Sequence, residues 1–207
     1  MPPSSSAMSK IIYFGQFAVT PQVFHKTQHS FCLVNLKPLL PGHVLVSPLR
    51  RVSHMTDLAA PEINDLFQTV QRVERTLKRL YGSDAFNIAI QDGPAAGQSV
   101  PHVHAHIIPR RWGDMDSRGG GDKMYELLEG EEGDVGLHLE EQQREQEEGG
   151  KKKYNRFPKQ SDEDRKPRDM ETMKKEAEWL AREMERDNGV EGSAVLREQD
   201  ESAGCSL

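Results

Sequence analysis

The chain has 207 residues, of which 35% are hydrophobic and 29% charged, so it can form one domain with a real core plus polar appendages. Its two cysteines, Cys32 and Cys205, exclude a disulfide framework, and no run approaches the roughly 18 apolar residues of a membrane span. Residues 1–10 lack the apolar stretch of a secretory signal. We therefore expect a soluble intracellular protein, cytoplasmic and also nuclear, with no membrane partner.

Charge is distributed unevenly along the chain. Residues 1–125 carry a net charge of +4, residues 126–148 carry −9, and residues 149–207 carry −1. A mildly basic first part suits a small anionic ligand but is far too weakly basic to predict nucleic-acid binding. The segment 119–166 is rich in Gly, Glu, Gln and Lys, which predicts a flexible acidic insert acting as a solvated linker, with regulation as the alternative role.

The predicted elements follow a flexible leader over residues 1–10. Apolar, β-rich runs predict strands at 11–14, 23–26, 31–36 and 44–46, the last one after a Pro-Gly turn. A helix is predicted from Pro61 to just before Gly82, since proline fits a first helical turn and glycine fits a stop. Its predicted apolar stripe consists of Ile63, Leu66, Phe67, Val70, Val73, Leu77 and Leu80.

The second half begins with an alternating strand at 85–93 and a small-residue loop at 93–101. The histidine-bearing stretch 102–108 is predicted as the next strand, and it closes an α+β domain over residues 11–118. Within the insert, four residues can dock locally: Met124, Tyr125, Leu127 and Leu128. Helical spacing returns over 167–188, where Asn188-Gly189 predicts the helix end, and a flexible tail is predicted over 189–207.

The stretch HVHAHII, residues 102–108, places His102, His104 and His106 at strict alternation, so a strand would present all three on one face. Three interpretations compete. Buried structural histidines are the first, although three in alternation beside a glycine loop argue against it. Zinc is the second, but the outer two residues of such a strand start roughly 13 Å apart, too far for a shared ion without steep leaning, so no metal site is predicted.

Phosphate chemistry is the third interpretation and the one we favour. A central imidazole can attack phosphorus, and adjacent imidazoles disfavour being charged together, which keeps the attacking ring neutral. In the preceding loop, Gly93 and Gly97 let backbone N–H groups approach an anion, and Gln98 and Ser99 add neutral hydrogen bonds.

Three stretches together carry a family resemblance: PGHVLV (41–46), QDGPAAGQSV (91–100) and HVHAHII (102–108). They resemble the histidine-triad (HIT) superfamily and, more narrowly, its Fhit branch of dinucleoside polyphosphate hydrolases, over residues 11 to about 128. The resemblance implies a HIT-like antiparallel sheet with packed helices, a homodimer, and hydrolysis of diadenosine triphosphate to AMP and ADP. No tightly bound cofactor is implied, although a substrate with several phosphate charges can travel with Mg²⁺ or Mn²⁺.

The same resemblance implies roles for individual residues. His104 would be the nucleophile that forms a transient adenylyl-histidine, and the backbone carbonyl of His102 would orient its ring. His102 and His106 would bind phosphate oxygens, with His43 supporting the triad. The implied substrate-binding residues are Asn35 for the ribose, Gln91 beside the phosphates, and the phosphate-binding loop of Gly97, Gln98, Ser99 and Val100. Tyr125 corresponds to the tyrosine of the family's flexible loop.

Two alternatives stay open at this point. The first is a nucleoside phosphoramidate hydrolase of the Hint branch of the same superfamily. The second is a signalling module whose nucleotide-loaded state recruits a partner through the insert and terminal helix, with slow hydrolysis resetting it. His106 stands where the transferase branch of the superfamily has Gln, which favours hydrolysis over nucleotidyl transfer.

Overall fold

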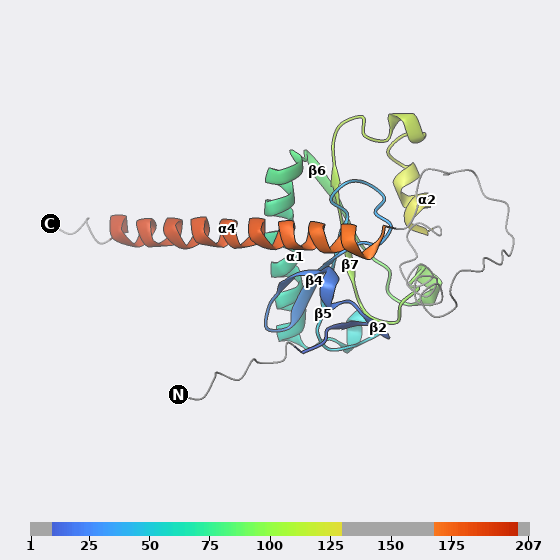
Figure 1. Ribbon diagram of the computed structural model, residues 1–207, viewed down its shortest axis with the longest axis horizontal. Coiled ribbons are helices and arrows are strands. Elements are labelled where there is room, and N and C mark those ends of the chain that lie inside the picture. The colour runs from blue at the N-terminus through green and yellow to red at the C-terminus, as the bar shows by residue number, and fades with distance from the viewer. Residues whose placement is uncertain (1–9, 130–167, 203–207) are drawn as a thin grey trace, which may run out of the picture.

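A five-stranded antiparallel sheet forms the centre of the computed structural model, which describes residues 10–129 and 168–202 (Figure 1). In spatial order its strands are β3 (Val23–Lys26), β4 (Ser30–Val34), β5 (Val44–Pro48), β7 (Ala105–Arg110) and β6 (Ala85–Ile90). A short hairpin precedes the sheet and pairs β1 (Tyr13–Phe14) with β2 (Phe17–Ala18). The helices are α1 (Ala60–Tyr81), α2 (Lys123–Glu129) and α4 (Met170–Ser202). The 3₁₀ turns are η1 (Thr20–Gln22), η2 (Met55–Asp57), η3 (Pro94–Ala96) and η4 (Asp116–Arg118).

Helix α1 has the start and stop that its sequence predicts. The side chain of Glu62 accepts the backbone N–H of Ala59 at 2.8 Å, and Gly82 ends the helix in the left-handed conformation at φ 57°. Four members of the predicted stripe are buried (Leu66, Val70, Val73 and Leu77), Ile63 and Leu80 are partly buried, and the side chain of Phe67 is 46% exposed. The reason is helical geometry: Phe67 follows the buried Leu66 directly, so it lies about 100° further around the helix.

The two faces of β7 belong to two separate apolar clusters. Ile107 lies in the main core together with Leu66 and Leu77 of α1. Its neighbour Ile108 lies in a second cluster with Leu39 and with the α2 residue Met124. Because successive strand residues point to opposite faces, His106 shares the face of Ile108 and therefore the side opposite α1.

Helix α4 crosses the sheet beside α1 and packs through four buried residues: Met173, Ala177, Leu180 and Met184 (Figure 1). An ion-pair group joins the two helices, in which Arg79 of α1 bonds Asp187 at 3.0 Å and Glu183 at 2.7 Å. The predicted helix end at Asn188-Gly189 was wrong, since α4 continues to Ser202. A single glycine costs a helix only about 1 kcal/mol relative to alanine, which does not by itself terminate it.

Two further predictions need correction. The histidine strand starts at Ala105, so His102 and His104 precede the strand and only His106 lies on it. The predicted insert starts at residue 119, yet α2 forms inside it and buries Met124, Leu127 and Leu128, the local docking that its apolar residues allowed. Residues 1–9, 130–167 and 203–207 lie outside the described residues, and the predictions of a flexible leader, insert and tail on them stay predictions. The predicted α+β fold with an antiparallel sheet and packed helices is confirmed.

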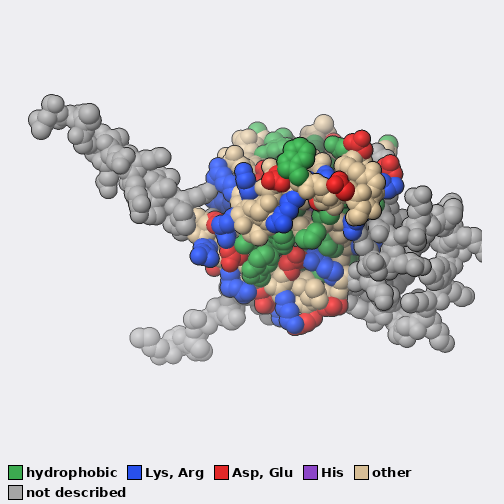
Figure 2. Space-filling model, turned by 90° about the horizontal axis from the view of Figure 1, so that it is seen from above, with side chains coloured by type: hydrophobic (Ala, Val, Ile, Leu, Met, Phe, Trp, Pro, Cys, Tyr) green, Lys and Arg blue, Asp and Glu red, His purple; other side chains and the backbone are tan. Residues whose placement is uncertain are grey.

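None of the helices in the described ranges is long and apolar enough to cross a bilayer. On the face shown in Figure 2, Lys and Arg side chains alternate with Asp and Glu, so that face presents no field of a single sign.

Candidate active site

His104 is held in one tautomer by the backbone of the preceding histidine. Its Nδ1–H donates a hydrogen bond to the carbonyl oxygen of His102 at 2.8 Å, which is the contact that the family resemblance implies. The lone pair of the ring therefore resides on Nε2, the nitrogen on the other side. Because the described hydrogen bond of this ring is made by Nδ1, Nε2 is the nitrogen available to a substrate.

His102 itself is turned into the core, because this segment is held by other elements before β7 begins. The backbone N–H of Gly15 donates to its Nδ1 at 3.0 Å, and its Nε2–H donates to the carbonyl of Pro48 at 2.8 Å. The ring of Phe14 stacks on it with centroids 5.5 Å apart. Both ring nitrogens are occupied, so the expectation that the His102 side chain binds phosphate does not fit this geometry; what it offers the site is its carbonyl.

His43 and His106 form a relay whose proton positions can be followed from one end. The backbone N–H of Leu39 donates to Nδ1 of His43 at 3.1 Å, so His43 carries its proton on Nε2. That Nε2–H donates to Nδ1 of His106 at 3.0 Å, which leaves the His106 proton on its own Nε2. This last N–H is completely buried and has no partner among the residues that the structure describes. A buried donor without a partner costs free energy, and at a functional site it marks a place for a ligand oxygen.

The rings of His104 and His106 lie close together, with centroids 4.9 Å apart. The free acceptor nitrogen of His104 and the free donor nitrogen of His106 thus belong to adjacent rings. This pairing suits a nucleophile beside a hydrogen-bond donor for the oxygen atoms of the group that it attacks.

Burial keeps all four histidines neutral. It lowers the pKa of His43 to about 3, with the positive charge of Arg168 as the next cause, and it lowers the pKa of His102 to about 4. Burial also lowers the pKa of His104, and it lowers that of His106 well below the usual value, with charge on His104 as a further cause there. The crowding expected from the sequence contributes at the neighbours of His104, whereas the pKa of His104 itself is lowered by loss of hydration.

Asn35 lies at the end of β4 and contacts the relay from the side. Its Nδ2 is 3.3 Å from Nε2 of His43, and its Oδ1 accepts the backbone N–H of Lys37 at 3.0 Å. The bond from Lys37 fixes which way the amide points, so the contact with His43 brings two N–H groups together and is not a hydrogen bond. The residue predicted to hold the ribose is therefore brought next to the histidines.

The glycine loop before the histidines is held by its flanking segments. Gly93 and Gly97 have φ values of 99° and 88°, which favour glycine, and the side chain of Gln98 donates to the carbonyl of Ser53 at 2.9 Å. Gln91 packs against Gly97 and donates to the carbonyl of Leu128, the next-to-last residue of α2, at 2.9 Å. Gln91 is thus committed to α2 in this structure. The side chain of Val100 is buried in the main core, so only its backbone can serve the loop. Ser99 lies in the same loop.

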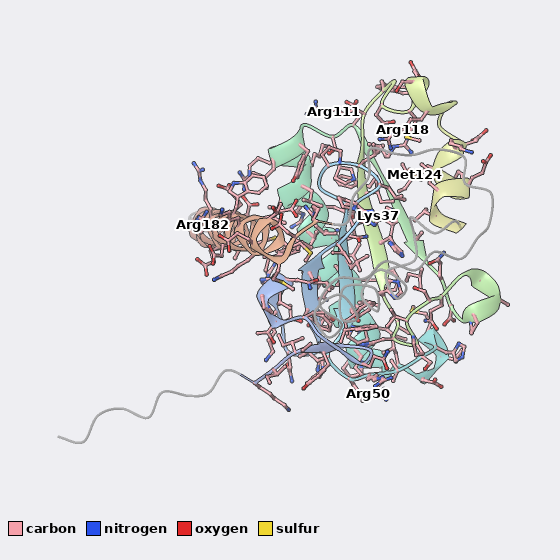
Figure 3. The ribbon with its side chains drawn as sticks, turned by 45° about the vertical axis from the view of Figure 1, so that its right-hand side comes forward. Lys37, Arg50, Arg111, Arg118, Met124 and Arg182 are labelled. Atoms are coloured by element: carbon pink, nitrogen blue, oxygen red, sulfur yellow. The ribbon has the colours of Figure 1, made fainter. Side chains whose placement is uncertain are left out.

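The arginines near these motifs are largely neutralised by neighbours. Arg50 bonds both carboxylate oxygens of Glu62, at 2.8 and 2.6 Å, and Arg110 does the same with Asp114 at 2.8 and 2.7 Å. Arg50 lies at the end of the molecule away from Arg118 and Met124, which lie together near α2 (Figure 3). Both guanidinium groups are therefore committed to carboxylates, and neither is placed in the site.

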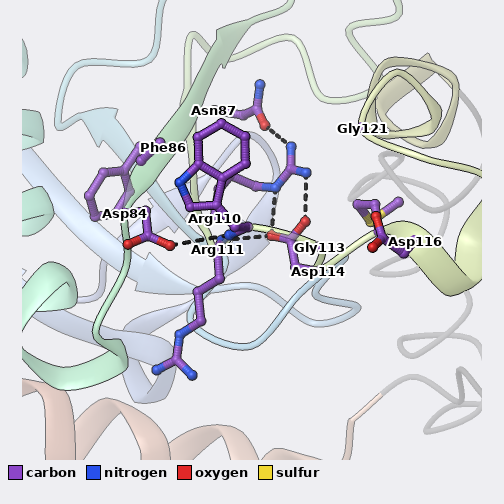
Figure 4. Close-up of a pocket in the computed structure, with 12 residues that line it drawn as sticks. Asp84, Phe86, Asn87, Arg110, Arg111, Gly113, Asp114, Asp116 and Gly121 are labelled. Carbon is purple, nitrogen blue, oxygen red and sulfur yellow. Dashed lines mark hydrogen bonds and ion pairs between the residues drawn. The ribbon is translucent and has the colours of Figure 1, made fainter.

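A separate pocket of about 460 Å³ lies beside β6 and the segment after β7 (Figure 4). Its walls include Phe86, Arg111 and the 93% exposed Trp112, and none of the predicted site residues lines it. Among the described residues no group of three or more His, Cys, Asp or Glu side chains is placed to hold a metal ion.

Comparison with known proteins fits this geometry. The model of the HIT domain matches residues 16–113. The asymmetrical bis(5'-nucleosyl)-tetraphosphatase of Schizosaccharomyces pombe is 45% identical over 174 residues, which cover 84% of this chain and 94% of that enzyme. The chain belongs to the HIT family.

Two further similar proteins are named as hydrolases of adenosine-containing triphosphates. The bis(5'-adenosyl)-triphosphatase of Saccharomyces cerevisiae is 51% identical over 123 residues, covering 59% of this chain and 58% of that enzyme. The crystal structure of the Plasmodium falciparum diadenosine triphosphate hydrolase, solved with cyclomarin A, superposes with a TM-score of 0.50 at 36% identity and covers 66% of this chain and 88% of that one. The predicted membership in the HIT family is confirmed.

Sequence reasoning missed three contributors to the site. Gly15 holds the His102 ring, Leu39 sets the tautomer of His43, and Arg168 contacts the backbone of Asn35. The first two act through backbone N–H groups, which every residue but proline carries, so no residue type could reveal them. The third is separated from its partner by 133 positions, and nothing in the local sequence connects them.

Proposed function

We propose that this HIT protein hydrolyses dinucleoside polyphosphates and cleaves diadenosine triphosphate to AMP and ADP through a covalent adenylyl-histidine. The names of the relatives confirm the predicted reaction class, hydrolysis of such a substrate. The observation that carries the proposal is the pairing of a free acceptor nitrogen on His104 with an unpartnered buried donor on His106.

The first step uses the Nε2 lone pair of His104. It forms an N–P bond to the α-phosphorus while the P–O bond to the departing ADP breaks, and the bonding electrons leave with ADP. The His102 carbonyl stabilises the charge that develops on the ring, since it already accepts the Nδ1–H. The His106 Nε2–H donates to a phosphate oxygen, and the relay from Leu39 through His43 keeps that proton in place.

The second step breaks the N–P bond that the first step formed. Water forms a P–O bond as the N–P bond breaks, which releases AMP and one proton and returns the lone pair to His104. Because burial holds the histidine neutral between turnovers, the nucleophile is regenerated without a separate deprotonation.

The proposal is tested with the His104→Asn variant. Asparagine cannot form the covalent intermediate, so we expect turnover of diadenosine triphosphate to be abolished while nucleotide binding, measured by calorimetry, is retained. Normal hydrolysis by the variant would show that the mechanism is wrong.

The substrate itself is tested by resolving the products from diadenosine triphosphate, diadenosine tetraphosphate and adenosine phosphoramidate in parallel. The tetraphosphate is included because the S. pombe relative is named for it. A dominant rate on the phosphoramidate would favour the Hint-type alternative over our proposal.

We further propose that the chain forms a homodimer through the outer edge of β6. Within residues 10–129 and 168–202 no strand pairs with this edge, and Ile88 on it is 44% exposed. An open apolar edge is a ready site for pairing with another strand. Ile88→Asp is expected to give a monomer by light scattering, whereas Ile11→Asp, which alters an isoleucine that is 56% exposed elsewhere, is expected to leave the dimer intact. A monomeric unaltered protein would contradict this proposal.

A further inference from the structure

Arg168, just ahead of α4, reaches the segment that carries the predicted ribose-binding residue. Its Nε donates to the carbonyl oxygen of Asn35 at 3.1 Å, and its Nη2 bonds the same oxygen. The backbone N–H of Arg168 donates to the carbonyl of Leu36 at 3.0 Å. One residue that lies 133 positions after Asn35 in the sequence therefore holds two neighbouring backbone carbonyls of this segment.

The guanidinium is itself held in place, which makes this contact a defined one. Its Nη1 is paired with Glu176, one turn and a half into α4, and both side chains are less than one-fifth exposed. Asp169 caps the start of the helix by accepting the backbone N–H of Thr172 at 2.7 Å. Arg168 is thus fixed by α4 on one side and fixes Asn35 on the other.

The position of Asn35 matters to the site in two ways. Its amide lies 3.3 Å from the His43 ring, and the same short segment continues to Leu39, whose N–H sets the His43 tautomer. A shift in its backbone therefore moves the predicted nucleotide contact directly. The positive charge of Arg168 also helps to lower the pKa of His43, which independently places the guanidinium within electrostatic reach of the relay.

We propose that Arg168 is a positioning residue for nucleotide binding, which makes the start of the C-terminal helix part of the site. This role for Arg168 rests on the proposed function. Arg168 acts through Asn35 and Leu36, and none of its described bonds reaches the free nitrogens of His104 and His106. Its loss should therefore weaken substrate binding while the chemical step, which the histidines perform, is largely preserved.

The competing interpretation is that Arg168 only helps to dock α4. Arg79 provides a matched control. It also joins α4 to the domain, through Asp187 and Glu183, but none of its described hydrogen bonds involves Asn35. Arg79→Gln removes the two charged contacts of Arg79 to Asp187 and Glu183 on the helix, and Arg168→Gln removes the one to Glu176. If docking alone mattered, the two variants would have the same kinetic effect.

The experiment measures kcat, KM and Tm for the full chain on diadenosine triphosphate. Arg168→Gln is expected to raise KM roughly 10-fold, equivalent to about 1.4 kcal/mol, with kcat within about 2-fold of the unaltered protein. Arg168→Lys should recover part of the KM, since an ammonium can still reach the Asn35 carbonyl. Arg79→Gln should lower Tm and leave KM unchanged.

Equal KM values for Arg168→Gln and Arg79→Gln would overturn the inference while leaving the hydrolase proposal intact. Should Arg168→Gln fail to fold, Arg168→Lys and Glu176→Gln provide the test: each keeps one of the two contacts, and each should raise KM by a smaller factor. An unaltered KM in both would also overturn it. If the unaltered protein hydrolyses no dinucleotide, the proposed function fails first, and that outcome is distinct.

Discussion

The four neutral buried histidines predict a steep loss of stability in mild acid. In the unfolded chain each imidazole has a pKa near 6.5, whereas the folded pKa is about 3 for His43 and about 4 for His102. The folded pKa is depressed, so the unfolded chain binds protons first. The stabilisation is therefore fully present above pH 6.5 and is lost as the pH falls toward the folded values.

The size of the effect follows from proton linkage. Between pH 7 and pH 5 a histidine that titrates only when unfolded lowers the free energy of unfolding by about 2 kcal/mol, so His43 and His102 together contribute about 4 kcal/mol. The lowered pKa values of His104 and His106 add to this loss. Against a typical total of about 5–15 kcal/mol, such a loss is a large fraction of the stability.

Urea denaturation at pH 7, 6 and 5 measures this loss. Replacing His43 with Gln should shrink the difference between pH 7 and pH 5 by about 2 kcal/mol, whatever the variant's stability at either pH. Val46→Ala, a change of a buried residue that does not titrate, should lower stability equally at both. A total loss below about 1 kcal/mol, or a variant that loses as much as the unaltered protein, would refute the assignment of neutral buried rings.

Two further predictions concern the parts that hold and complete the site. Gly15→Ala should lower the free energy of unfolding, measured by urea denaturation, by about 2–4 kcal/mol, because the new Cβ would lie 2.4 Å from Val100 at a φ of +57°. The control is Gly119→Ala, which also has a positive φ but lies in open space and should lose only the free energy of backbone strain. Equal losses in the two variants would show that the contact with Val100 does not destabilise the protein. His106→Ala should lower kcat roughly 10²-fold with little change in KM, because the buried Nε2–H that donates to the phosphate oxygen is lost; an unchanged kcat would remove His106 from the chemistry.

The local elements could be predicted because they depend on neighbouring residues. A β-rich run placed β3 over 23–26, and a proline that fits the first helical turn placed the start of α1 at Pro61, within one residue of its observed start. Where such local signals are weak, the prediction was wrong: one glycine at 189 was too small a penalty to end α4.

The residues of the candidate site could be predicted from the sequence, but the directions in which their side chains point could not. The sequence indicated His43, His104 and His106 through the motif that they form, and the structure brings them together. It could not indicate that the His102 ring faces Gly15 and Pro48, because strict alternation holds only within a strand and this strand starts three residues later.

The sequence by itself determined the α+β class, which follows from periodicity, and the family, which follows from the resemblance of its histidine motif and flanking stretches to the HIT superfamily. Only the tertiary structure decided which ring nitrogens are free, because each tautomer is set by a backbone group such as the Leu39 N–H or the His102 carbonyl. It also decided that Arg168 meets Asn35 across 133 positions. Contacts of that kind depend on how the elements pack, and packing brings together residues whose separation along the chain carries no information about their distance in space.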